Sequence, residues 1–267
     1  MDDVRRPDGR SRPPARATRS RTAVRLLALA VGLSTVASAC SGSESGSSVA
    51  STDTASVSST SEVSPSTTAS GSEEVAFTAE VWADNWFSLS VNGEVVGEDS
   101  VPITTERSFN AETIEFTATY PLTIAMVTKD FKEDETGLEY IGTDRQQMGD
   151  GGFIAQFTDT DTGKVVATTG SGWRGFVVHR GPLDVSCEGS SDPSTDCTFE
   201  STPEPGDWTS PSFTDETWTT ATEYEPDAVG AKDGYDTITW DPAASLIWTD
   251  SLKQDNTILW RTTVSAP

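Results

Sequence analysis

The sequence predicts an all-β protein with the architecture of a β-sandwich or jelly roll. Short runs of alternating apolar and polar residues are separated by turns rich in Gly, Asn and Asp, which is the pattern of half-buried strands. No stretch keeps a helical period beyond about ten residues. All eight tryptophans lie between Trp82 and Trp260, so the apolar core belongs to the C-terminal part of the chain. Many short strands joined by such turns are typical of sandwiches.

The first expected strands form a hairpin. Residues 75–82 predict one strand, and apolar and polar residues alternate over 86–91 in a second. Asn92 and Gly93 then turn the chain, and 94–96 return. A type I′ turn requires positive φ at both central residues, and Asn-Gly tolerates this, so the dipeptide is a strong hairpin signal.

The other expected strands follow from the same alternation. Residues 114–120 place apolar side chains on one face, and Pro121 ends that run because it cannot donate to a strand ladder. Residues 159–163 predict a hairpin turn, because Gly163 comes one place too early for an EF-hand calcium loop. The remaining strands are expected at 122–128, 153–158, 164–168, 173–178 and 258–264.

Residues 1–39 have the features of a signal peptide. Eight arginines precede an apolar run from Leu26 to Val36, which has the size of a signal-peptide core. That run is too short for a membrane span, which needs about 20 apolar residues. The leader predicts export of the mature chain.

The cleavage region allows two interpretations. Ala37-Ser38-Ala39 fits ordinary signal peptidase, which would release a soluble protein that begins at Cys40. The same residues followed by Cys40 resemble a bacterial lipobox, although Ala37 stands where Leu or Val is usual. The lipobox interpretation is favoured, because it explains a cysteine placed just before a polar segment. Two acyl chains on Cys40 would anchor the protein stably to the outer face of the bacterial cell membrane.

Residues 40–73 predict a tether, and residues 74–267 a single sandwich domain. The tether is almost entirely Ser, Thr, Gly, Ala, Val and Glu, with no apolar period. Such a segment buries too little surface to offset its chain entropy, so we expect it to be disordered.

Cys187 and Cys197 are expected to form a disulfide. They enclose a polar loop in an exported chain, and an oxidising compartment favours pairing. A zinc site is disfavoured because His179 is the only other Cys or His near this pair. This pairing leaves Cys40 without a partner, which fits its lipidation.

The charge of the mature chain excludes some partners. Eight of the 18 basic residues and three of the 42 acidic residues lie before Cys40, so the remainder carries a net charge of −29. This charge argues against nucleic acid and against anionic lipid surfaces. We expect a monomer with a solvated acidic surface.

Three stretches resemble one architecture. Residues 84–97 are similar to the Val-Asn-Gly hairpin of galactose-binding-like jelly rolls. Residues 149–174 resemble the matching part of the N-terminal accessory domain of bacterial α-L-rhamnosidases, and residues 205–218 resemble a Gly-Trp…Phe-Asp…Trp element of the same domains. The resemblance implies a galactose-binding-like jelly roll that is associated with carbohydrate and is usually non-catalytic. The Cys187–Cys197 loop is an addition to that pattern.

Several residues are candidates for ligand binding. Exposed tryptophan faces beside acidic or amide groups are the usual chemistry of sugar recognition. Most of the eight tryptophans must pack in the core, so at most one or two should be exposed. For Asp84 and Asn85, which precede the hairpin, a turn-forming role is favoured. The candidates are Asp84, Asn85, Trp86, Trp173, Trp208 and Trp218.

The densest acidic run, 130–139, could supply oxygen ligands for Ca²⁺ from Asp130, Glu133 and Asp134. The favoured interpretation is a solvated loop. His179 is the only histidine, and a structural role is favoured for it. No nucleophile, zinc or phosphate-loop motif is present in the sequence.

These observations favour a cell-surface lipoprotein whose sandwich binds a ligand without catalysis, and the expected ligand is a glycan of the envelope or the environment. One alternative is a structural or protein-interaction module that has no small ligand. A glycoside hydrolase is the third, because it requires only two facing carboxylates.

Replacement of Cys40 tests the anchor. If the lipobox is used, Cys40→Ser should shift the protein completely from the membrane fraction to the medium, measured by immunoblot of both fractions. Wild-type protein already present in the medium would contradict lipidation and favour ordinary signal peptidase.

Overall fold

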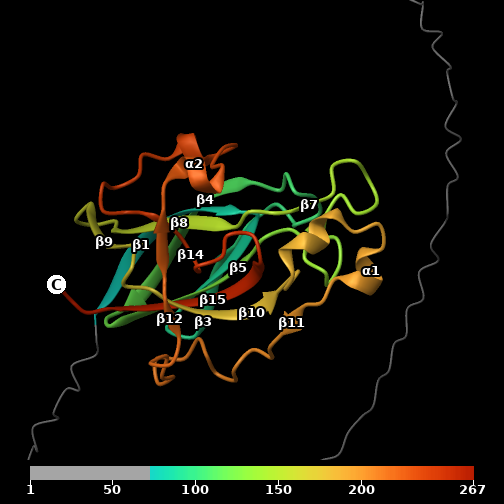
Figure 1. Ribbon diagram of the computed structural model, residues 1–267. Helices are drawn as coiled ribbons and strands as arrows, with labels where there is room; N and C mark the ends of the chain where they lie inside the picture. Colours follow the sequence, from blue (N-terminus) through green and yellow to red (C-terminus); the bar gives the residue numbers. More distant parts are fainter. Residues whose placement is uncertain (1–72) are drawn as a thin grey trace, which may run out of the picture. The chain divides into compact units, whose positions relative to one another are not determined.

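Two antiparallel sheets pack face to face in the structure, a computed structural model that describes residues 73–267 (Figure 1). The first sheet has the order β13 (Thr222–Tyr224), β14 (Leu246–Trp248), β8 (Gly152–Asp159), β1 (Glu74–Asp84) and β4 (Asn110–Thr119), and β9 (Lys164–Thr168) also pairs with β8. The second has the order β11 (Glu200–Ser201), β10 (Arg174–Arg180), β15 (Asp255–Val264), β5 (Leu122–Lys129), β2 (Trp86–Val91) and β3 (Glu94–Glu98), and β12 (Thr219–Thr220) also pairs with β10.

The other elements are short and lie in the loops. A separate ribbon consists of β6 (Leu138–Glu139) and β7 (Gln147–Met148). The helices are the 3₁₀ turns η1 (Val185–Gly189) and η2 (Tyr235–Thr237) and the single turns α1 (Pro193–Asp196) and α2 (Pro226–Val229). None of these described helices has the length and apolar character needed to cross a membrane. The predicted all-β class is therefore confirmed.

The predicted turns are present. Asn92 and Gly93 have φ of 53° and 92°, as a type I′ hairpin between β2 and β3 requires. The Asn92 amide also donates to Thr119 O and accepts from Thr123 N, so it ties the hairpin to the neighbouring strands. Residues 159–163 form the predicted turn between β8 and β9. The signal peptide, Cys40 and the tether lie outside the described residues.

Alternation of side chains sets the core between the sheets. In β1, Phe77, Ala79, Val81 and Ala83 all face the second sheet and are buried. Phe87, Leu89 and Val91 of β2 meet them from the other side, together with alternate residues of β5, β8 and β15. A period of two along each strand produces this single apolar layer.

Two excursions of the chain cover the outer faces of the sandwich. Residues 203–218 lie over the second sheet and bring Trp208 and Trp218 against Leu259. Residues 225–245, which include α2, lie over the first sheet and pack Val229 against Trp82 (Figure 1). The strands are therefore buried on both faces near these excursions.

Arg261 fixes the first of these excursions. Its guanidinium is 2% exposed, pairs with Asp215 at 3.2 Å, and donates to the carbonyl oxygens of Trp208 and Phe213. A buried cation requires such partners, because removal from water is costly. The outward-facing Arg261 of β15 thus holds the excursion on the sheet.

The edge of the second sheet is one strand split into two pieces. Glu200 and Ser201 pair with Arg180 and His179, whereas Thr219 and Thr220 pair with Gly175 and Arg174. Both pieces run antiparallel to β10, and the excursion 203–218 leaves and re-enters between them (Figure 1). The sequence analysis did not predict this split edge, because strands of two residues have no detectable period.

The predicted disulfide between Cys187 and Cys197 is present, with a Cα–Cα distance of 5.6 Å. It joins η1 to the end of α1, in a loop where Leu138 and Met148 supply the apolar contacts. Because few core residues hold this loop, the disulfide carries much of its stability.

Removal of the disulfide should destabilise this loop. In the chain-entropy treatment, a closed loop of this size contributes about 2–3 kcal/mol. We expect the Cys187→Ala/Cys197→Ala variant to lose about this free energy of unfolding in urea titration. Reductant should lower the stability of the wild type and leave the double variant unchanged. Equal stability of the wild type and the double variant without reductant would contradict the expectation.

Candidate functional site

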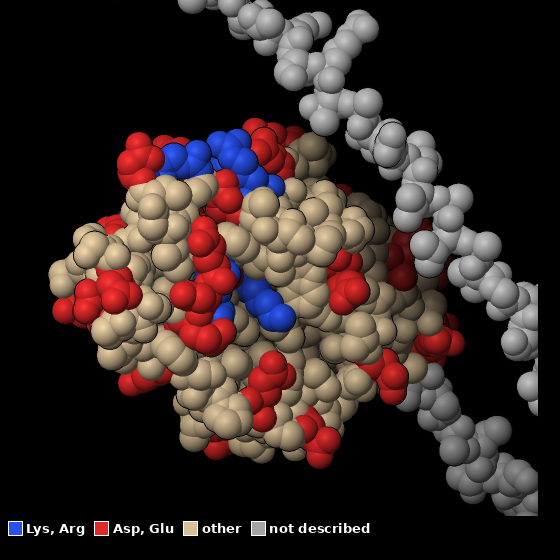
Figure 2. All heavy atoms as spheres, turned by 90° about the vertical axis from the view of Figure 1, so that its right-hand side faces the viewer, with Lys and Arg blue, Asp and Glu red and all other residues tan. Residues whose placement is uncertain are grey.

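Charged side chains gather at one end of the sandwich. This end contains the last residue of β1, the residue after β5, the ribbon β6–β7 and the start of β15, and it lies opposite the end where β1 begins and the chain terminates (Figure 1). Figure 2 looks onto this end and shows acidic groups around a few basic ones. We call it the loop end.

Three carboxyl groups are buried within the loop end, and a fourth lies beside them at the surface. Asp84, Asp130 and Glu139 are each at most 4% exposed, whereas Asp150 is exposed. Burial, followed by repulsion from Asp130 and Asp150, raises the pKa of Asp84 well above its usual range. Burial and the charges of Glu139 and Asp150 do the same to the pKa of Asp130. Burial is also the main cause of the raised pKa of Glu139.

A chain of hydrogen bonds shows how Asp130 is accommodated. The nitrogen of the Asn256 amide faces Gly181 O, Gln254 O and the Nδ1 atom of His179, at 3.0–3.3 Å. His179 is therefore neutral and donates from Nε2 to Glu135 O at 3.1 Å. The Asn256 oxygen then faces Asp130, which is favourable when Asp130 carries a proton.

This network gives His179 the structural role favoured from the sequence. The side chain is 3% exposed, and burial lowers its pKa. The acidic run 130–139 differs from the expected solvated loop. Its two ends, Asp130 and Glu139, are buried because they close the loop end, and Glu133 and Asp134 between them are exposed.

The run does not form a calcium site in the described structure. No group of three or more His, Cys, Asp or Glu side chains within residues 73–267 could hold a metal ion. The Asp134 carboxylate instead accepts from the backbone N of Thr136 and from its hydroxyl. Asp130 is buried against Asn256, whereas Glu133 and Asp134 are exposed.

Asn85 joins segments of the loop end and is not free to bind a ligand. Its backbone N donates to Lys129 O, its amide donates to Glu106 O, and its side-chain oxygen accepts from Phe131 N. Asn85 is 1% exposed, so its polar groups serve the fold. Asp84, by contrast, makes no side-chain hydrogen bond with any described residue, and burial raises its pKa well above the usual range.

The tryptophan candidates have different environments. Trp173, Trp208 and Trp218 are 2%, 8% and 5% exposed, so they are packed rather than presented to solvent. Trp173 belongs to the main core, where it packs against Phe153 and Phe157 and donates to Thr168 O. Trp86 is half-buried, with the Lys129 ammonium 4.7 Å from its ring centre. None of the eight tryptophans is exposed: Trp86 and Trp240 are half-buried and the other six are buried, so no tryptophan presents the open face expected for sugar binding.

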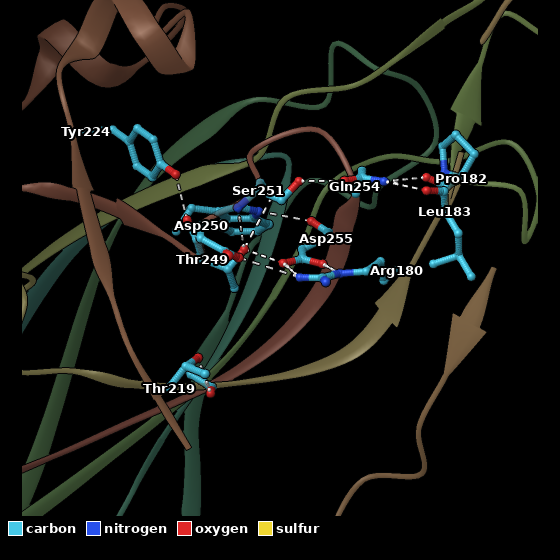
Figure 3. A network of polar contacts seen from close by, with 12 residues as sticks. Arg180, Pro182, Leu183, Thr219, Tyr224, Thr249, Asp250, Ser251, Gln254 and Asp255 are labelled. Carbon is cyan, nitrogen blue, oxygen red and sulfur yellow. Dashed lines mark hydrogen bonds and ion pairs between the residues drawn. The ribbon is translucent and has the colours of Figure 1, made fainter. Parts of the chain in front are cut away.

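Half-buried Arg180 forms an ion pair with the fully buried Asp255 (Figure 3). Arg180 donates from Nε and Nη2 to the two carboxylate oxygens of Asp255, which is fully buried. Thr249 Oγ1 also donates to Asp255, and Trp248 Nε1 donates to its backbone oxygen. Tyr224 OH donates to Thr249 O and extends the network to β13.

A slot opens where the edge strand is split. It has a volume of about 270 Å³ and is lined by the β10 segment 175–178 and by both pieces of the edge. The polar lining consists of Arg180, Glu200, Thr202, Thr217 and Thr219, and Trp218 contributes an aromatic edge. We call this cavity the edge slot.

The floor of the edge slot offers backbone groups. Gly175 O accepts from Thr219 Oγ1, and Val178 O accepts from Thr202 N, so β10 turns polar groups toward the split edge. Val177 lies opposite the gap between the two pieces and pairs with neither of them. A bound molecule could therefore meet main-chain groups, three hydroxyls, a guanidinium and a carboxylate within one small cavity.

The structure unites some predicted site residues and separates others. Asp84, Asn85 and Asp130 meet at the loop end, Trp218 lines the edge slot, and Trp173 is a core residue. The sequence analysis missed Arg180, Glu200 and the three threonines of the slot. Polar residues in and beside short strands carry no local pattern that marks a binding site. The Pro-rich segment 203–211 was the signal in the sequence that a strand is interrupted there.

Comparisons with protein-family models, curated proteins and solved structures found no match to this chain. The fold and the site geometry are therefore the basis for proposing a function.

The buried acids predict an unusual pH dependence. A carboxyl group whose pKa is raised on folding stabilises the protein below its ordinary pKa of about 4, and this contribution is lost as pH rises toward the folded pKa. Asp99, whose pKa burial raises to about 6, acts in the same direction. We expect unfolding free energy to increase between pH 7 and pH 5.

Asp130→Asn should remove much of this dependence. The variant should be more stable than the wild type at pH 7 by about 1 kcal/mol or more, because one pKa unit corresponds to about 1.4 kcal/mol. The two should converge near pH 4, measured by urea denaturation across pH. Glu133→Gln, an exposed acid of the same loop, is the control. A variant less stable than the wild type at pH 7 would show that Asp130 is ionised and supported.

Proposed function

We propose that the described domain is a non-catalytic glycan-binding module, and that the edge slot holds the sugar. The observation that carries this proposal is the mixed lining of the slot. Hydroxyls of Thr202, Thr217 and Thr219, the Arg180 guanidinium and the Glu200 carboxylate surround a cavity of about 270 Å³. Ligand pockets usually begin near 300 Å³, so this slot suits a single sugar unit of a longer chain.

The chemistry of the lining matches a polyhydroxylated ligand. Sugar hydroxyls both donate and accept hydrogen bonds, and the slot offers both kinds of partner. Trp218 and Phe176, with ring centres 5.4 Å apart, form an apolar wall against which C–H groups can pack. Arg180 is held by Asp255, so its remaining N–H groups are positioned before a ligand arrives.

The geometry does not favour hydrolysis. A glycosidase needs two carboxyl groups that flank the substrate in an open cleft. The carboxylates that cluster at the loop end are buried, with Asp130 and Glu139 at 3% and 4% exposure. The edge slot itself is lined by one carboxylate, Glu200.

The proposed cellular setting is the outer face of the bacterial membrane, reached through the lipid on Cys40. The resemblance to galactose-binding-like jelly rolls supports a carbohydrate ligand, because those domains are associated with glycans. The loop end lies opposite the start of β1, where residues 1–72 join the domain, so it faces away from the point of attachment (Figure 1).

A protein-interaction module is a second candidate, supported by one specific observation. Leu183, Val185 and Phe199 are three of the five exposed large apolar residues in the described domain, and all lie around the disulfide loop. Small exposed apolar groups on one loop can contribute to a protein interface. This surface is separate from the slot lining, so the two candidates can be tested independently.

Blocking the slot should abolish glycan binding. Thr217 is exposed and lines the slot, so Thr217→Trp fills the cavity without disturbing the core. In a glycan array with the full chain, we expect this variant to lose binding at least tenfold. Thr214→Trp, an exposed residue of the same excursion outside the slot, should bind like the wild type. An array without any wild-type binding would reject the proposal.

A further inference from the structure

We infer that the edge slot prefers a glycan that carries free amino groups over neutral or acidic sugars, with Glu200 as the residue that recognises the ammonium. This inference rests on the proposed function, because it names the class of sugar for the same slot. It follows from the charges that line the slot and from how each is already paired.

Arg180 does not provide a free positive charge. Its Nε and Nη2 are taken by the buried carboxylate of Asp255, and Asp250 lies 3.6 Å from Nη2. The combined negative charge of Asp255 and Asp250 exceeds the positive charge of the Arg180 guanidinium. The free N–H groups of Arg180 can still donate to hydroxyl oxygens, but the local charge does not attract an anion.

Glu200 is the unbalanced charge of the slot. It is exposed, lines the cavity, and forms no ion pair with a basic group anywhere in residues 73–267. The basic residue opposite it in the register is Arg180, which forms its ion pair with Asp255; the charge of Glu200 acts on Arg180 after those of Asp255 and Asp250. Arg174, at the far end of β10, donates to Thr220 and does not line the slot.

The surrounding domain reinforces this preference. Counting from Glu73, the described chain carries 36 Asp and Glu against 10 Lys and Arg, a net charge of −26. A cationic ligand is therefore attracted at long range, and an anionic ligand is repelled. An ammonium placed on the sugar beside Glu200 would complete the one pair that the slot leaves open.

Three oligosaccharides with the same β-1,4-linked backbone separate the possibilities. Glucose oligomers are neutral, glucosamine oligomers carry an ammonium at position 2 at the mildly acidic pH of the test, and glucuronate oligomers carry a carboxylate at position 6. We expect the full chain to bind glucosamine oligomers about two- to fivefold more tightly than glucose oligomers in calorimetry at low salt, the size of an exposed ion pair. Glucuronate oligomers should bind most weakly.

The matched variant is Glu200→Gln, which keeps size and hydrogen bonding but removes the charge. It should reduce the glucosamine-to-glucose affinity ratio to about one, and 0.5 M salt should do the same to the wild type. Glu204→Gln, an exposed acid outside the slot, should keep the preference.

The possible outcomes have different meanings. Equal binding of glucose and glucosamine, or a preference that survives Glu200→Gln, overturns the inference and leaves glycan binding intact. Binding of none of the three, together with a blank array, rejects both the inference and the proposed function.

Discussion

The loop end of this protein depends on the carboxylate of Asp255. It is fully buried at the start of β15, and a buried charge is tolerated only when it is paired and hydrogen-bonded. Arg180 of β10 supplies the pair, and Thr249 adds a further donor from the loop after β14. Because Trp248 of the other sheet donates to the backbone oxygen of Asp255, the same residue ties the two layers of the sandwich together. Loss of this carboxylate would release Arg180 as well.

Other acids of the same end are accommodated in the opposite way. Asp84 and Asp130 form no ion pair with a basic group of the described domain, and burial raises the pKa of each. A carboxyl group that takes up a proton costs less to bury than an ionised one. Close approach of the Gly149 backbone requires this site to lack a side chain, since a Cβ there would lie 2.5 Å from Asp130 Oδ2. The loop end thus combines an ion pair with buried carboxyl groups that lack one.

The excursion 203–218 links the fold to the proposed site. It leaves the edge strand after Thr202 and returns at Thr219, and Arg261 holds it against the sheet in between. A continuous edge strand would have paired fully with β10 and left no cavity. The insertion both covers the apolar outer face with Trp208 and Trp218 and opens the slot beside Val177. Packing of Trp208 and Trp218 on the sheet therefore holds the slot open, and Trp218 also lines it.

The sequence by itself determined the class of fold and most of its long strands. Alternation in β1, β4, β5 and β15, the Asn92-Gly93 turn and the disulfide all act over short distances along the chain, so local patterns report them. Tertiary structure alone decided which polar residues meet. Glu200 and Thr217 lie seventeen positions apart, and Arg180 and Asp255 seventy-five, yet each pair shares one site. Whether an acid is buried, paired or exposed depends on neighbours from other strands. A local sequence pattern does not show which residues these neighbours are.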